Sequence, residues 1–179
     1  MWKKGGLFMN LLYTEEELST LSRRVKRRTV ISLIASLPFF AAFVVFFIMH
    51  LQISPSNPGP IADDTLKLLA SVACILALCI LIFGLSFFVR PIRSYRNHVQ
   101  TALFGRAREA THCFLHLEPD LSVIDGITFR SLVFEGEPDR HGIAEHMYYW
   151  DVLKEIPDFA EGEAVTIRFY DRFITGWSR

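Results

Sequence analysis

Two apolar stretches decide the fold of this chain. They read VISLIASLPFFAAFVVFFIMHL (residues 30–51) and LKLLASVACILALCILIFGLSFFV (residues 66–89). An α-helix rises about 1.5 Å per residue, so about 20 residues cross the roughly 30 Å hydrocarbon core of a bilayer. We therefore predict a transmembrane hairpin of two helices, about residues 30–51 and 66–89, joined by an outer loop over residues 52–65.

Basic side chains flank both stretches and predict the orientation of the hairpin. They are Arg23, Arg24, Lys26, Arg27 and Arg28 before the first stretch, and Arg90, Arg93 and Arg96 after the second. The loop over residues 52–65 contains no Lys or Arg. Because basic residues accumulate on the cytoplasmic side of spans, we predict a multi-pass protein of the cell (inner) membrane with both termini cytoplasmic. The same clusters make anionic lipids candidate partners, with topology alone as the alternative explanation.

Residues 1–29 are predicted to be a cytosolic segment that contains a basic amphipathic helix. Thr14 followed by Glu17 forms a capping box, in which the hydroxyl and the carboxylate satisfy free backbone N–H groups at a helix start. The helix is expected to begin at about Glu15 and to end near Arg28. Met1 and Met9 are both candidate start residues.

Small residues recur along both apolar stretches and predict where the helices pack. They are Ser32, Ala35 and Ala42 in the first stretch, and Ala70, Ala73, Ala77 and Gly84 in the second. Such stripes allow close approach of helices in lipid, so we expect them to face each other or a second copy. Pro38 predicts a kink in the first helix. No charged residue lies deep in either stretch, which argues against a self-contained transporter.

The rest of the chain changes from a helical to a strand pattern. Residues 90–110 are predicted to be a juxtamembrane helix ending near Gly105, and residues 111–179 a cytosolic all-β domain. The expected strands cover residues 111–118, 121–124, 127–135, 143–150, 164–170 and 172–178. Asp125-Gly126 predicts a two-residue hairpin turn, and Pro119-Asp120 a break between strands. Asp151 is expected to cap a short helical turn.

Five or six short strands in about 80 residues are typical of a small OB- or SH3-like barrel. The predicted fold class is therefore an α+β membrane protein, in which a two-helix transmembrane hairpin precedes a small cytosolic β-barrel. A membrane anchor followed by such a barrel resembles the layout of NfeD-type proteins. The layout carries this resemblance and no sequence motif does, so it implies no function and no site residue.

The tail contains few residue patterns that indicate chemistry. His112 and His116 are four residues apart, which in a strand separates them by about 13 Å, too far for one metal ion. The stretch with Asp139, His141, Glu145 and His146 has ligand types without a recognised spacing, so we predict no metal and no cofactor. Residues 97–179 carry eight basic and fourteen acidic side chains, and this net charge of minus six opposes nucleic-acid binding.

The aromatic run Met147-Tyr148-Tyr149-Trp150 is the strongest candidate for a contact with another protein. We expect one pair of these side chains in the barrel core and the other pair in a protein contact. Tyr148 and Trp150 share one face of the predicted strand and Met147 and Tyr149 share the other, and the alternation alone does not decide which face is exposed. We name Tyr148 and Trp150 as the candidate partner contact. With no catalytic motif in the sequence, we predict a non-enzymatic accessory or scaffold protein whose β-domain binds a protein partner or self-associates. The alternatives are a subunit of an oligomeric channel or transporter, and a metal-dependent enzyme that uses His112, His116, His141 or His146.

Overall fold

The computed structural model describes residues 9–52, 61–136, 138 and 144–179, and its chain divides into two compact units. The sheet unit combines the chain up to Ser22 with Arg93–Arg179, and the helical unit is Arg23–Ile92. The predicted cytosolic segment over residues 1–29 is therefore not a separate part, because its described residues up to Ser22 belong with the sheet. Most of the predicted outer loop lies outside the described residues.

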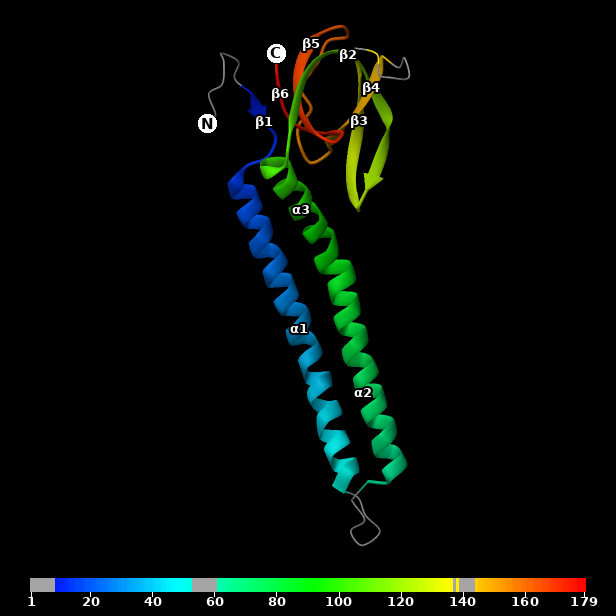
Figure 1. Ribbon diagram of the computed structural model, residues 1–179. Helices are drawn as coiled ribbons and strands as arrows, with labels where there is room; N and C mark the ends of the chain where they lie inside the picture. Colours follow the sequence, from blue (N-terminus) through cyan, green and yellow to red (C-terminus); the bar gives the residue numbers. More distant parts are fainter. Residues whose placement is uncertain (1–8, 53–60, 137, 139–143) are drawn as a thin grey trace. The chain divides into compact units, whose positions relative to one another are not determined.

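The helices follow the two apolar stretches (Figure 1). The first, α1, is Glu15–Gln52, and α2 is Asp63–Phe83, continued by the π-helical segment η1 (Gly84–Val89) and by α3 (Arg90–Phe104). By length and composition, two of these helical runs are long and apolar enough to cross a membrane. The expected helix that ends near Arg28 is instead the first part of α1, because nothing between Arg28 and the apolar stretch breaks a helix.

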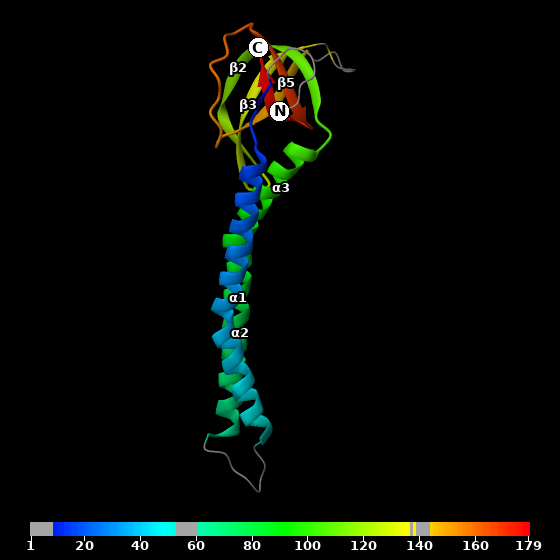
Figure 2. The same cartoon turned by 90° about the vertical axis from the view of Figure 1, so that its left-hand side faces the viewer.

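The start of α1 and the packing of the helical pair agree in part with the predictions. The Glu17 N–H donates to Thr14 Oγ1 over 3.2 Å, so the hydroxyl half of the predicted capping box is confirmed. The Glu17 carboxylate instead accepts from Tyr95 and Lys154. Figures 1 and 2 both draw α1 alongside α2. Of the small residues in α2, Ala70, Ala73 and Ala77 are buried, and Gly84 is buried in η1. A Cβ atom at Gly84 would lie 2.6 Å from Ser32 Oγ, so α1 and η1 approach closely there. Ala35 is exposed and contributes nothing to this contact.

Six strands form one sheet in the order β1-β6-β4-β3-β2-β5, and β5 also pairs with β6. The strands are β1 (Asn10–Leu11), β2 (Arg108–Ile124), β3 (Ile127–Glu135), β4 (Glu145–Asp151), β5 (Ala164–Tyr170) and β6 (Phe173–Ser178). The pairs are antiparallel except for one parallel bridge between β4 and β6, Tyr149 to Phe173. The chain is thus α+β, with two long apolar helices followed by the sheet.

The strands differ from the prediction mainly in β2. The expected strands over residues 111–118 and 121–124 are one strand, which takes in Pro119-Asp120 through a register shift between Leu117 and Leu121. The juxtamembrane helix α3 ends at Phe104, next to the predicted end near Gly105, and β2 begins at Arg108, three residues before the predicted start of the β-domain at residue 111. The Asp125-Gly126 turn is confirmed, since both residues have the positive φ (53° and 76°) that a primed turn requires. Ile143, the expected start of β4, lies outside the described residues.

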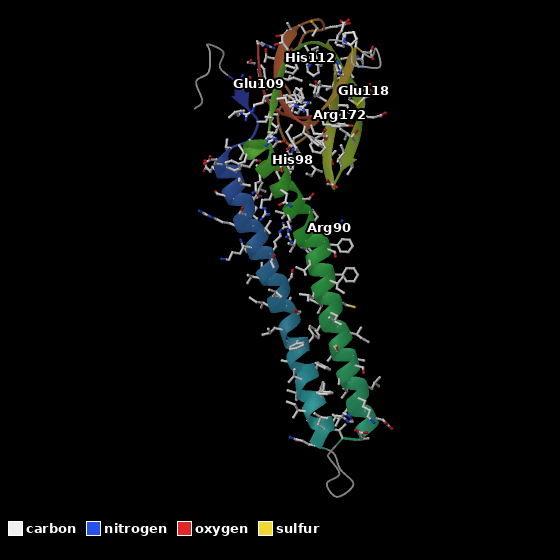
Figure 3. All side chains as sticks on the ribbon, in the orientation of Figure 1. Arg90, His98, Glu109, His112, Glu118 and Arg172 are labelled. Atoms are coloured by element: carbon white, nitrogen blue, oxygen red, sulfur yellow. The ribbon has the colours of Figure 1, made fainter. Side chains whose placement is uncertain are left out.

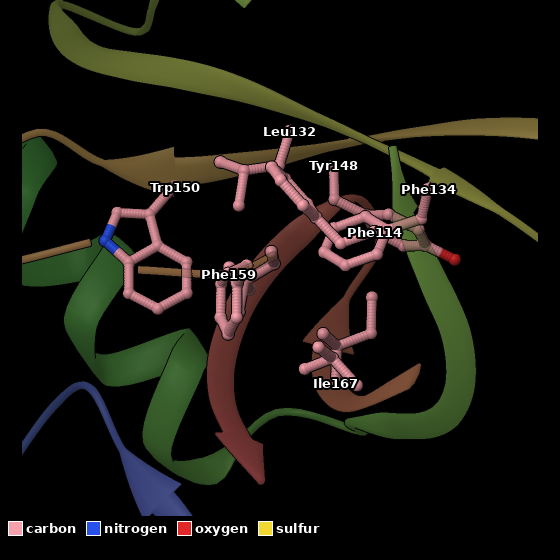
Figure 4. Close-up of a cluster of buried hydrophobic side chains, with 9 residues drawn as sticks. Phe114, Leu132, Phe134, Tyr148, Trp150, Phe159 and Ile167 are labelled. Carbon is pink, nitrogen blue, oxygen red and sulfur yellow. The ribbon is translucent and has the colours of Figure 1, made fainter. Parts of the chain in front are cut away.

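A cluster of buried apolar and aromatic side chains packs together in the sheet unit (Figure 4). Alternation in β5 points Val165 and Ile167 inward, and both are fully buried. The other members are Phe114, Leu132, Phe134, Tyr148, Trp150, Phe159 and Ile174. The sheet unit therefore has a hydrophobic core of its own.

Candidate functional site

The sheet unit contains a polar group of side chains around Asp151, which we call the Asp151 cluster. Its members come from three parts of the sheet unit: Tyr13 and Glu17 at the start of α1, Tyr95 and His98 on α3, and Asp151 and Lys154 at and after the end of β4. Asp151 is fully buried. Burying a carboxylate is costly unless it accepts hydrogen bonds, so its partners determine whether this position is tolerated.

Asp151 accepts hydrogen bonds on both carboxylate oxygens. The Tyr95 hydroxyl donates to Oδ2 over 2.7 Å, and the Tyr13 hydroxyl donates to the same oxygen over 3.2 Å. The Leu153 N–H donates to Oδ1 over 2.9 Å. The predicted capping role of Asp151 is confirmed, although the segment it caps is a turn and not a helix. Three donors, from α3, from the segment before α1 and from the turn after β4, thus compensate the buried charge.

His98 extends this network into the apolar face of the sheet. Its Nε2 lies 3.0 Å from the Tyr13 hydroxyl, and its ring packs against the rings of Phe129 and Phe173 at 5.2 and 5.1 Å (Figure 3 labels His98). Burial lowers the pKa of His98, while the nearby Asp151 opposes that shift. Since Tyr13 donates its one proton to Asp151, its oxygen is left to accept from His98 Nε2–H, which favours that tautomer of the neutral ring.

An ion pair closes the cluster on its solvent side. Lys154 Nζ lies 2.6 Å from Glu17 Oε2, and the same ammonium lies 5.1 Å from the centre of the Tyr13 ring. Burial, followed by the charge of Asp151, raises the pKa of the Tyr13 hydroxyl far above its usual value. Burial and the hydrogen bond to Asp151 do the same to the pKa of Tyr95. Both phenols therefore stay protonated as donors, and the cluster acts as a joint between α1, α3 and β4.

Sequence reasoning found only two members of this cluster, and for local roles. Glu17 and Asp151 were recognised as capping residues. Tyr13 and Tyr95 are separated from Asp151 by 138 and 56 residues, so no spacing in the sequence connects them. The sequence contained one compositional signal for this cluster. Tyr95 and His98 form a polar pair on a helix that is otherwise amphipathic.

The predicted partner contact at Tyr148 and Trp150 is wrong. Tyr148 is 7% exposed and Trp150 is 0% exposed, and both belong to the core cluster. The Trp150 Nε1–H donates to the Lys154 carbonyl over 3.3 Å, which satisfies its polar group inside the fold. The face of β4 that carries these rings is the inner face, and Met147, on the opposite face, is exposed.

The predicted basic residues at the membrane interface are largely on the surface. The exposed members are Arg23, Arg24, Lys26, Arg27, Arg28, Arg90 and Arg93 (Figure 3 labels Arg90). Arg28 Nη1 also donates to the Phe88 carbonyl over 3.2 Å within the helical unit. Arg96 is half-buried and its Nη2 donates to Asn97 Oδ1 over 2.6 Å, so it is less available than the others.

Two of the four histidines named for a metal enzyme come together. The rings of His112 on β2 and His146 on β4 lie 5.5 Å apart, and His112 Nε2 lies 3.1 Å from the Tyr148 hydroxyl. Burial, and then the neighbouring His146, lowers the pKa of His112. His116 is separate, with its Nε2 3.5 Å from Glu118 Oε1, and His141 lies outside the described residues. Within the described part of the chain no three His, Cys, Asp or Glu side chains are grouped as metal ligands.

The His112 ring packs closely against Gly136. Among the described residues His112 Nδ1 is buried without a hydrogen-bond partner, and a Cβ atom at Gly136 would clash with this nitrogen. A side chain at position 136 is therefore incompatible with this position of the His112 ring, whose Nε2 faces the Tyr148 hydroxyl. Comparison of the chain with protein-family models, with curated proteins and with solved structures finds no match.

Proposed function

We propose that this protein is a membrane-anchored accessory or scaffold protein. Its two apolar helices span the cell (inner) membrane with both termini in the cytoplasm, and its sheet unit is a small OB- or SH3-like barrel. This barrel binds a protein partner or a second copy of the chain. The observation that carries the proposal is the Asp151 cluster, because it ties the sheet to both α1 and α3, the helices that continue into the apolar stretches.

The surface of the helical unit supports the membrane assignment. Large apolar side chains point outward along both helices, with Ile34 63% and Phe87 68% exposed. A protein that met water there would expose far more contiguous apolar surface than soluble proteins tolerate. The exposed basic residues at the cytoplasmic ends of both stretches support the proposed orientation.

The strand pairing supports the barrel. Since β5 pairs with both β2 and β6, and β6 bridges to β4, each strand from β2 to β6 has a partner on both sides. The bridge between β4 and β6 is the weakest point of this ring, with one pair of residues. A partner strand could add at β1, whose two residues pair only with β6.

The channel alternative loses one of its supports. It depended on small-residue stripes that would pack several copies around an axis. Ala70, Ala73 and Ala77 are buried within the single chain, so this stripe is not available to a neighbouring copy. The accessory role is therefore preferred.

Native mass spectrometry of the full chain in mild detergent tests the proposed binding. We expect a defined homo-oligomer or a co-purifying protein, and crosslinking in membranes should recover the same species. A monomer that recovers only background proteins after crosslinking would overturn the proposed function. Topology is tested separately with single cysteines in a variant that has Ser at positions 74, 79 and 113. Gly162→Cys should react only from the cytoplasmic side, and Ser56→Cys only from the outside.

A further inference from the structure

The turn between β2 and β3 contains the one Asp-Gly pair of the sequence, Asp125-Gly126. Both residues are exposed and have positive φ, 53° at Asp125 and 76° at Gly126. Apart from the chain neighbours of Gly126, no described heavy atom lies within 4 Å of the place that a Cβ atom at this glycine would take. Gly126 therefore adds no steric barrier next to the carboxyl group of Asp125.

An aspartate that precedes a glycine can rearrange its own backbone in two steps. First, the Gly126 nitrogen attacks Cγ of the protonated Asp125 carboxyl group. The N–Cγ bond forms, the Cγ–OH bond breaks, and the hydroxyl leaves with the N–H proton as water. Water then adds to one of the two carbonyls of the cyclic imide. Opening at the side-chain carbonyl restores aspartate, whereas opening at the backbone carbonyl gives isoaspartate, in which the chain runs through Cγ. The reaction takes only water, and glycine favours it because no Cβ atom obstructs ring closure.

The folded turn holds the two reacting atoms apart. A primed turn has a ψ of about +30° at its first central residue, which directs the Gly126 nitrogen away from the Asp125 side chain. The Ile124–Ile127 pair closes the base of the turn. The Ser94 hydroxyl of α3 donates to the Asp125 carbonyl over 2.8 Å, and both residues belong to the sheet unit. The reaction therefore requires the turn to open, and the bond from Ser94 opposes that opening.

From these contacts, we propose that Asp125-Gly126 is a site of isoaspartate formation and that Ser94 limits its rate. The inference involves the sheet unit alone, so it does not depend on the proposed membrane function. Isoaspartate adds one carbon atom to the backbone, so the two-residue turn no longer fits and the Asp125 carbonyl moves away from Ser94. Phe129 of the same hairpin packs against His98 of α3 with ring centres 5.2 Å apart, so the modified hairpin should hold α3 less firmly.

The turn between β5 and β6 provides a control within the same chain. Asp171 is exposed and has a positive φ of 56°, as Asp125 does. The residue after it is Arg172, whose side chain obstructs attack by its backbone nitrogen. A comparison of the two turns therefore separates the effect of the following glycine from the effects of exposure and backbone conformation.

Peptide mapping of the full chain, aged in mild detergent near neutral pH, tests the proposal. Electron-transfer fragmentation distinguishes isoaspartyl from aspartyl peptides of equal mass. Ageing in water enriched in the heavy oxygen isotope labels each carboxyl group that has passed through the imide. Ser94→Ala removes the hydroxyl, and Ser94→Thr keeps one. Thr101→Val is the matched control, because the Thr101 hydroxyl donates to the Asn97 carbonyl of the same helix over 2.9 Å.

We expect isoaspartate and the heavy isotope at Asp125 and not at Asp171. Ser94→Ala should accelerate the reaction about two- to tenfold, the equilibrium effect of one net hydrogen bond, whereas Ser94→Thr and Thr101→Val should keep the wild-type rate. Isoaspartate at Asp125 no more frequent than at Asp171 would overturn the site. Equal rates in Ser94→Ala and Thr101→Val would overturn the role of Ser94. Faster reaction of Asp171 as well in Ser94→Ala would also overturn that role, because general unfolding would then be the cause.

Discussion

The helical unit and the sheet unit place their apolar side chains in opposite directions. In the sheet unit Trp150, Phe134 and Ile167 are buried in one core, while in the helical unit most large apolar side chains point outward. The sheet unit can therefore gain stability from its own interior. The helical unit buries small residues such as Ala70, Ala73 and Ala77 and leaves most of its large apolar side chains exposed. Under the proposed membrane function, the bilayer covers these exposed side chains.

Polar side chains follow the same division. In the helical unit hydroxyls bond to the backbone of their own helix, as Ser36 does to the Leu33 carbonyl and Ser71 to the Lys67 carbonyl. In the sheet unit Asp151 collects donors from α3 and from the segment before α1. Local bonds satisfy a polar group without joining elements, whereas the bonds to Asp151 hold distant segments together. In the helical unit the bond from Arg28 to the Phe88 carbonyl also joins two helical segments, but it lies at an exposed side chain, whereas Asp151 is fully buried.

The largest difference between the units is expected for removal of a buried ring. Trp150→Ala should destabilise the sheet unit by about 3–5 kcal/mol, because it removes a fully buried side chain and leaves a cavity. Hydrogen exchange of the sheet amides in detergent measures this loss. Ile34→Ala, at an exposed site of α1, is the control and should leave sheet exchange unchanged. Similar losses in both variants would contradict the separation of the two units.

The helical unit should be sensitive at one point, Gly84. Gly84→Ala forces a methyl group to within 2.6 Å of Ser32 Oγ, and overpacking of this kind costs about 1–3 kcal/mol. The free energy of unfolding of the helical unit, followed by hydrogen exchange of α2, should fall accordingly. Adding Ser32→Gly removes the clashing side chain and should restore most of the loss. If the double variant were no better than Gly84→Ala, the close approach at Ser32 would not be the cause.

Much of the fold could be predicted from the sequence because the signals are local. About 20 consecutive apolar residues indicate a long helix, and Asp125-Gly126 indicates a primed turn whatever surrounds it. Pro119 misled the strand prediction for the same reason. A proline inside a strand argues for a break when read locally, yet an irregular register lets β2 continue past it.

The candidate site was beyond such reasoning because its bonds are long-range. Which face of β4 is inside depends on strands that pair with it from elsewhere, so Tyr148 and Trp150 were assigned to the surface when they belong to the core. Tyr13 and Asp151 are 138 residues apart in the sequence, so their contact depends on the tertiary structure. The two-residue strand β1 is too short to show any alternation.

Within the sheet unit, the Asp151 cluster is expected to have the next largest effect. Asp151→Asn keeps the shape of the side chain but replaces one acceptor oxygen with a donor that faces a backbone N–H or the tyrosine hydroxyls. We expect a loss of about 1–3 kcal/mol in the free energy of unfolding of the sheet unit. Tyr95→Phe should cost less in the Asp151→Asn background than in the wild type. The exposed control Asp158→Asn should change stability little, and equal losses at both aspartates would contradict the role of Asp151.

The smallest effect is expected from the pH dependence that His98 contributes. Burial lowers its pKa below the usual 6.5, and Asp151 offsets part of that shift. At pH values between the lowered pKa of folded His98 and 6.5, the unfolded chain binds more protons than the folded chain. The stability that neutral His98 contributes is therefore complete above pH 6.5 and is lost as the pH falls through the pKa of His98 in the folded state. His98→Gln should therefore flatten the stability of the sheet unit measured between about pH 8 and about pH 5. The slope should decrease without vanishing, because burial also lowers the pKa of His112. His116→Gln, at an exposed site, is the control. If His98→Gln left the slope of stability against pH unchanged, the His98 imidazole would be solvated, whereas the Asp151 cluster requires it to be buried.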